Sequence, residues 1–211
     1  MNDTVTFDPA CVRCPRLAGH LAAVRRDHPG YHAAPVAPFG PGNAPLLIVG
    51  LAPGMHGANA TGRPFTGDHA GILLYHTLHA FGFSNQPNAV APDDGLVLKD
   101  CRVTNAVKCL PPQNKPTPAE IRTCNGFLAA EIDAVAPRII LALGRIAHDA
   151  VLRAQGLALA AHPFAHAAEH DLGQGRRLFD SYHCSRYNTQ TRRLTTAMFE
   201  ELFREIRARL S

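Results

Sequence analysis

The chain has 211 residues, of which 46% are hydrophobic and 18% are charged, with a formal net charge of +4. These values fit one folded, soluble domain over residues 1–211, and the mild positive charge is compatible with a polyanionic partner. No apolar run approaches the roughly 20 residues that span a bilayer, and the first residues lack the basic and apolar regions of a secretory signal. The sequence therefore predicts a cytoplasmic protein with reduced cysteines and no membrane partner.

In the first half of the chain, a helix is predicted at 15–27, directly after a pair of cysteines. The apolar run 46–49 ends at Gly50 and predicts a buried strand. Apolar residues at helical spacing predict a helix at 70–81, and the run 103–107 predicts the next buried strand.

In the second half, Thr117 and Glu120 have the spacing of a capping box, so we expect a helix from there to about Val135. The remaining elements, in order, are a strand at 139–143, a helix at 144–155, a strand at 178–182 and a helix at 189–210. Strands that alternate with helices predict an α/β fold, a three-layer α/β/α sandwich around a central, mostly parallel four-stranded sheet.

Polar segments of unusual composition follow three of the four predicted strands, at 50–68, 105–108 and 183–188. Ligands of such sheets bind at the carboxyl ends of the strands. The sequence therefore predicts that these three segments form a single site.

Four of the six cysteines form two pairs, Cys11 with Cys14 and Cys109 with Cys124. Thiolates are soft ligands for iron–sulfur clusters or zinc. The second pair lacks the Cys-x2-Cys spacing that is usual for zinc. Spacing alone leaves open an iron–sulfur cluster, a structural zinc ion or buried apolar thiols.

Four motifs follow one another in a fixed order along the chain. They are GLAPG at 50–54, GRPFTGDxxG at 62–71, TNAVKC at 104–109 and SYHxSRxNT at 181–189. Together they resemble the motifs of the iron–sulfur uracil-DNA glycosylases. Within that superfamily the chain resembles family 5, the type b enzymes, because Leu51 is apolar where family 4 carries an acidic residue.

The resemblance implies a [4Fe–4S] cluster held by Cys11, Cys14, Cys109 and Cys124. It also implies hydrolysis of the N-glycosidic bond of uracil, and of other deaminated bases such as hypoxanthine or xanthine, in double-stranded DNA. The base would be flipped out of the duplex into a pocket. We expect no lyase activity, since no lysine is placed in the motifs for a Schiff base, and a monomer is the simplest assembly.

The resemblance assigns the pocket walls to the first three motifs. The backbone of Leu51, Ala52 and Pro53 would contact the base. Phe65 would stack on it, although a core aromatic is the alternative. Asn105 would recognise the base edge, because an amide supplies both a donor and an acceptor, although it could instead cap a strand end.

Catalysis is assigned to Asp68 and His183, together with Asn105. His183 would donate a hydrogen bond to O2 of the leaving base, where negative charge develops, and a surface histidine is the alternative. Asp68 would orient water or stabilise an oxocarbenium-like sugar. Its alternative is an N-cap of the helix at 70–81.

The fourth motif is expected to contact DNA through Arg186, Tyr187, Asn188 and Arg192. The loop from Arg186 to Arg193 would enter the minor groove and hold phosphates, and Tyr187 would insert into the base stack. A solvated basic helix is the alternative.

A different class of function stays open, namely a non-catalytic iron–sulfur or zinc module that binds damaged DNA or transfers electrons. His183 and Asp68 argue against it, because such a module does not need that pair. Activity restricted to uracil, as in family 4, is a milder alternative, and Leu51 argues against it.

Overall fold

The computed structural model describes residues 6–211, so the expectation that no secretory signal is present falls partly outside the described residues. The helices are α1 (Pro15–Asp27), α2 (Ala58–Thr61), α3 (His69–Ala80), α4 (Pro118–Val135), α5 (Arg145–Ala154), α6 (Arg186–Gln190) and α7 (Thr196–Leu210), with 3-10 turns at Pro112–Asn114 and Leu159–Ala161. The strands are β1 (Leu46–Gly50), β2 (Cys101–Asn105), β3 (Ile139–Leu143), β4 (Glu169–Gly173) and β5 (Arg176–Ser181). Within residues 6–211, no helix combines the length and the hydropathy that crossing a membrane requires.

The strands form one sheet in the order β2-β1-β3-β5-β4. The first four of these pair in parallel, and only β4 runs antiparallel, against β5. The register aligns Gly50 with Asn105 and Leu143 with Ser181. The carboxyl ends of the four parallel strands therefore lie at the same edge of the sheet, as the α/β prediction requires.

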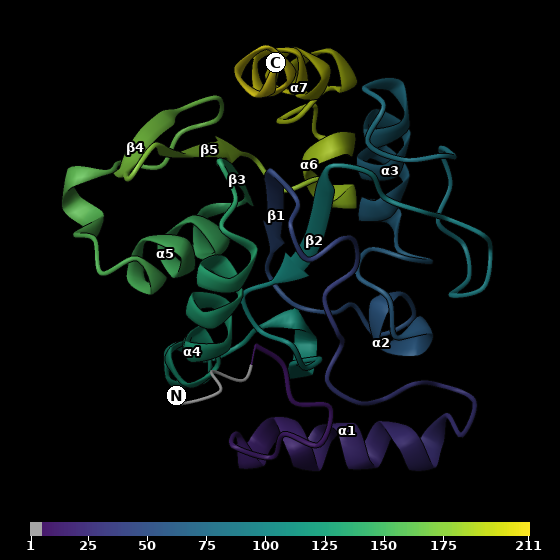
Figure 1. The fold of residues 1–211 in the computed structure, drawn as a ribbon. Coiled ribbons are helices and arrows are strands. Elements are labelled where there is room, and N and C mark those ends of the chain that lie inside the picture. The colour runs from purple at the N-terminus through teal and green to yellow at the C-terminus, as the bar shows by residue number, and fades with distance from the viewer. Residues whose placement is uncertain (1–5) are drawn as a thin grey trace.

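Apolar side chains cover both faces of the sheet. On one face, Ile48 and Val103 pack with α3 and α7, for example against Leu74 and Phe203. On the other face, alternate strand residues such as Val49 pack with α1, α4 and α5. Figure 1 shows α4 and α5 on one side of the strands and α3 on the other. This arrangement confirms the predicted three layers.

The prediction of a four-stranded sheet is wrong, because residues 6–211 contain a fifth strand, β4, at the edge. Its sequence, Glu-His-Asp-Leu-Gly, is mostly polar, and none of its side chains is fully buried. An edge strand that is only partly covered does not need the apolar run that marks β1 and β3. Hydrophobicity therefore did not reveal it.

The single C-terminal helix predicted at 189–210 is also wrong, since two helices, α6 and α7, occupy this region. Arg192 lies between them with a φ of +58°. This left-handed conformation cannot be part of a right-handed α-helix, so the helix ends before it. Thr195 then opens α7 by accepting a hydrogen bond from the Met198 amide at 3.2 Å. The break leaves α6 free to lie beside the carboxyl end of β5 (Figure 1).

Candidate active site

A cavity of about 460 Å³ lies at the carboxyl ends of the parallel strands. This is within the usual size of small-molecule pockets. Its lining includes most of the residues that the motifs singled out for the base and the chemistry, namely Leu51, Ala52, Phe65, Asp68, Asn105, His183 and Arg186. Pro53 is buried and does not line the cavity. Gly54, His69, Asn114 and Ser185 also line it and were not predicted.

The close approach of Phe65 and Asn105 depends on a glycine at the end of β1. A Cβ atom built on Gly50 would lie 2.5 Å from Cζ of Phe65 and 2.5 Å from Oδ1 of Asn105. Beyond the strands, the amides of Ala106 and Val107 donate to the carbonyls of Gly50 and Leu51, at 2.9 and 3.0 Å. These bonds fix the first turn against the residues that follow β2.

The segment that carries Phe65 is stabilised by a buried ion pair that lies outside the cavity. Arg63 Nη2 lies 2.7 Å from Asp94 Oδ2, and Arg63 Nε donates to Thr66 Oγ1 at 2.8 Å. Tyr75 donates its hydroxyl proton to the carbonyl of Pro64 at 2.7 Å. The arginine lowers the pKa of the Asp94 carboxyl far below its usual range. Phe65 itself has a φ of +55°, a strained conformation that these contacts maintain.

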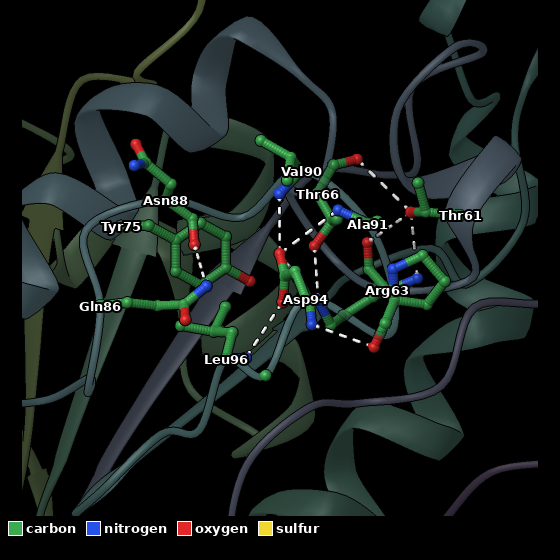
Figure 2. Close-up of polar contacts among 12 residues, drawn as sticks. Thr61, Arg63, Thr66, Tyr75, Gln86, Asn88, Val90, Ala91, Asp94 and Leu96 are labelled. Atoms are coloured by element: carbon green, nitrogen blue, oxygen red, sulfur yellow. Dashed lines mark hydrogen bonds and ion pairs between the residues drawn. The ribbon is translucent and has the colours of Figure 1, made fainter.

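Asp94 belongs to a network that sequence reasoning missed. Its carboxylate also accepts hydrogen bonds from the amides of Val90, Ala91 and Leu96, at 2.8, 3.3 and 3.0 Å (Figure 2). These hydrogen bonds fold the loop between α3 and β2 around Asp94, which in turn pairs with the guanidinium of Arg63. Asp94 is separated from Arg63 by a whole helix and lies in no motif, so no local signal marks it.

Asp68 occupies the N-cap position of α3, but its side chain makes no capping hydrogen bond to that helix. The carboxylate instead accepts from the amide of Ala58, in α2, at 3.2 Å. A Cβ on Gly57 would lie 1.9 Å from Cγ of Asp68, so this glycine makes room for the carboxylate. Burial raises the pKa of Asp68, while the Ala58 amide and His56 oppose the rise.

His183 follows β5, and its ring is roughly parallel to that of Phe65, at a centroid distance of 6.1 Å. Surrounding protein atoms desolvate the imidazole and lower its pKa to about 4. The ring is therefore neutral near pH 7 and has one N–H to donate. The ring is only partly exposed and lines the cavity, which does not fit the alternative of a surface histidine.

The predicted DNA-contacting residues lie at and beyond the mouth of the cavity. Arg186 lines it, while Tyr187 is 70% exposed and Arg192 is exposed further along the turn. Asn188 points back instead, and its Nδ2 donates to the carbonyl of His183 at 2.8 Å. His69 Nε2 lies 3.1 Å from Thr189 Oγ1 and ties α6 to α3.

The two cysteine pairs come together in a separate pocket with apolar walls, which is lined by Cys11, Cys14, Cys109 and Cys124. None of them forms a disulfide, and the backbone amide of Lys108 approaches Cys124 Sγ at 3.4 Å. Burial and the three neighbouring sulfurs raise the pKa of Cys109 to about 12. Four convergent sulfurs are the donor set of an iron–sulfur cluster or a thiolate zinc site. Cys101 and Cys184 are buried in the core instead.

Comparison with known proteins gives one consistent result. The family model described as the uracil DNA glycosylase superfamily matches residues 37–207. A type-5 uracil-DNA glycosylase of Thermus thermophilus is 48% identical over 204 residues, covering 93% of this chain and 92% of its own. A protein of the same name from Mycobacterium tuberculosis is 44% identical, and the match covers 92% of this chain and 76% of the relative. Another, from Pyrobaculum aerophilum, is 42% identical, with 94% of this chain and 88% of the relative covered.

Proposed function

This chain belongs to the uracil-DNA glycosylase superfamily, within it to the family of the type-5 enzymes, and we propose that it excises uracil from DNA by hydrolysing the N-glycosidic bond. The observation that carries this proposal is the convergence of Phe65, Asn105, His183 and Asp68 on one cavity. The substrate is double-stranded DNA, and the range extends to other deaminated bases such as hypoxanthine and xanthine.

The walls of the cavity suit a flipped base. The Phe65 ring offers a face for stacking. The amide of Asn105 can both donate to and accept from the polar edge of the base. Leu51 adds no charge to the lining, which is compatible with bases of different shape.

The chemistry follows from the states of two side chains. As the bond between the sugar and the base breaks, the base leaves with the electron pair, and the neutral His183 donates a hydrogen bond to the oxygen that becomes negative. Water adds to the sugar carbon and loses a proton, while the base gains one. Asp68 is the carboxylate that orients this water or stabilises the positive sugar.

The product is an intact strand with an abasic site. Strand cleavage by a lyase needs an amine that attacks the sugar. Among residues 6–211, no lysine lines the cavity. The nearby Lys108 is buried, and its ammonium group is paired with Glu131 at 2.9 Å. These features support a monofunctional enzyme.

DNA is expected to lie across the mouth of the cavity. Arg186 and Arg192 are placed to hold phosphates, and the exposed ring of Tyr187 is placed to fill the gap left by the flipped base. Asn188 contributes by holding the His183 backbone. A monomer is sufficient for this arrangement, since one chain supplies every residue named.

A [4Fe–4S] cluster is part of the proposal, and Cys11, Cys14, Cys109 and Cys124 would hold it. When bound, the cluster supplies a structural cross-link between the N-terminal segment, the end of β2 and α4. A cytoplasmic location goes with it, because the four thiols must stay reduced to act as ligands.

The test is base release from duplex oligonucleotides that carry uracil, hypoxanthine or xanthine opposite cytosine or guanine, with protein purified without oxygen. We expect release of uracil and of at least one deaminated purine, and no cleavage before alkali is added. His183→Gln should slow release by roughly 100-fold or more, while His76→Gln, on the exposed face of α3, should have no effect.

Binding of these duplexes without release of any base would overturn the proposal and favour the non-catalytic module. Release of uracil alone would retain the glycosylase and overturn the broader range of bases.

A further inference from the structure

A second cluster of metal-binding side chains lies outside the cavity and the cysteine pocket. It consists of His148 on α5, His170 on β4 and Asp180 on β5, whose potential ligand atoms all lie within 4.8 Å of one another. His148 Nδ1 is 2.8 Å from Asp180 Oδ1, and His170 Nε2 is 3.1 Å from Asp180 Oδ2. The side chains are 1%, 10% and 0% exposed, in the order named.

The orientation of His148 is set by a backbone carbonyl. Its Nε2 lies 2.9 Å from the carbonyl oxygen of His162. A carbonyl only accepts, so Nε2 carries the proton and Nδ1 presents a lone pair to the carboxylate in the neutral ring. Two lone pairs facing each other at this distance need a cation between them, either a proton or a metal ion. A histidine that ligates a metal typically donates its other N–H to a carbonyl in this way.

The charge balance also calls for a cation. Asp180 is completely buried, and within residues 6–211 its ion-pair partners are histidines alone, with no lysine or arginine. An isolated buried carboxylate is strongly unfavourable unless it is paired or coordinates a metal. The positive charge that balances Asp180 is therefore either a second proton on His148 or a metal ion, and a divalent ion supplies it through the ligand atoms that already converge here.

We propose that His148, His170 and Asp180 bind a zinc ion that has a structural role. Two imidazole nitrogens and one carboxylate oxygen are ligands that zinc commonly takes. A water molecule or His162 completes the site, since the His162 ring is 5.6 Å from that of His170 and its Nδ1 is occupied by the carbonyl of Ala158 at 3.0 Å.

The ion would join α5 to the β4–β5 hairpin at the edge of the sheet. Asp180 precedes His183 by three residues, so the same ion would help to fix the end of the strand from which His183 extends. This inference concerns a site separate from the glycosylase cavity and does not depend on base excision.

The test measures zinc and iron in protein purified without oxygen, and then the change in Tm when zinc is returned to protein from which a chelator has removed zinc but not iron. Measuring both metals distinguishes the two sites, because iron reports on the cysteine pocket and zinc on the histidine cluster. The variant is His170→Gln, because a glutamine amide can still donate to Asp180 while it is a poor zinc ligand. His76→Gln is the matched control, since it removes an exposed histidine on α3, which lies on the other side of the sheet from α5.

We expect about one zinc per wild-type chain, and a Tm roughly 5–10 °C higher with saturating zinc than in the zinc-free protein. His170→Gln should lose most of the zinc and of the Tm rise with its iron unchanged, and His76→Gln should behave as the wild type. Equal zinc and equal Tm rise in wild type and His170→Gln would overturn the proposal, as would a wild type that binds no zinc.

A second measurement covers the case in which His170→Gln does not fold. Cobalt added to wild-type protein that has its full iron content should show ligand-field bands without a thiolate charge-transfer band. Absence of the ligand-field bands, or a thiolate band alone, would overturn the site and leave a proton between His148 and Asp180.

Discussion

Burial acts on two titratable side chains of the cavity and favours the uncharged form of each. It raises the pKa of Asp68, so this carboxylate is a stronger base than an exposed aspartate. It lowers the pKa of His183 to about 4, so this ring stays neutral across the physiological range. The neutral histidine and the basic carboxylate are the states that the proposed hydrolysis requires.

The rate of base release should therefore fall on the acid side as Asp68 takes up a proton, at a pH above the value of about 3.9 that is usual for aspartate. No inflection is expected near pH 6.5, because His183 is already neutral there. Single-turnover rates from pH 4.5 to 9 test this. Asp68→Asn should slow release by roughly 100-fold or more and remove the acid limb, whereas Asp93→Asn, at an exposed position, should change neither. An acid limb that persists in Asp68→Asn would contradict this role.

Among the connecting segments, the one between α2 and α3 places both Phe65 and Asp68 in the cavity. It is held by the pair of Arg63 and Asp94, whose side chains are 7% and 8% exposed. Removing one partner of a buried ion pair leaves the other charge unpaired in a poor solvent. The segment should therefore be sensitive to a substitution that touches no substrate.

Asp94→Ala is expected to lower the free energy of unfolding by about 3–5 kcal/mol and to weaken binding of the flipped base, since Phe65 loses its support. Urea unfolding measures the first effect. The control is Glu201→Gln, which removes an exposed ion pair with Arg204 on α7 and should lower the free energy of unfolding by less than about 1 kcal/mol. Equal effects of the two substitutions would show that the Arg63 network does not stabilise the segment.

Across the entire fold, the four cysteines connect parts of the chain that are far apart in sequence. Cys11 and Cys14 precede α1, Cys109 follows β2, and Cys124 lies in α4. The proposed cluster on these sulfurs would close a long loop of the unfolded chain, and its binding free energy would add to the free energy of folding.

Cys124→Ala is expected to lose about four iron atoms per chain and to lower Tm by roughly 10 °C or more. Cys184→Ala is the control, because this cysteine is buried in the core away from the cysteine pocket and its loss should leave the iron content unchanged. Iron content and thermal unfolding are measured together. Cys124→Ala protein that retains its iron, or wild-type protein that holds zinc in place of iron on these thiols, would contradict the cluster.

Local sequence was sufficient to predict an element where burial of a strand or the cap of a helix imposes a residue pattern. The runs in β1 and β3 are buried on both faces, so they had to be continuously apolar. Thr117 and Glu120 form the expected capping box at the start of α4. The motifs at the strand ends also predicted most of the cavity, because parallel strands bring their carboxyl ends to one edge.

Packing between distant segments decided the features that the sequence did not predict, namely the edge strand, the break in the C-terminal helix and the partners of the buried charges. β4 is polar because it lies at an edge, and the turn at Arg192 that separates α6 from α7 follows from no local signal. Likewise, Asp94 meets Arg63, and Asp180 meets His148, across separations that no spacing rule covers. The sequence by itself indicated which strand ends carry the candidate site residues, because hydrophobic periodicity locates the strands and the motifs mark the segments that follow them. Both signals are local. Which partner each buried charge finds was decided by the tertiary structure, because a desolvated group must be satisfied by whatever the fold places beside it.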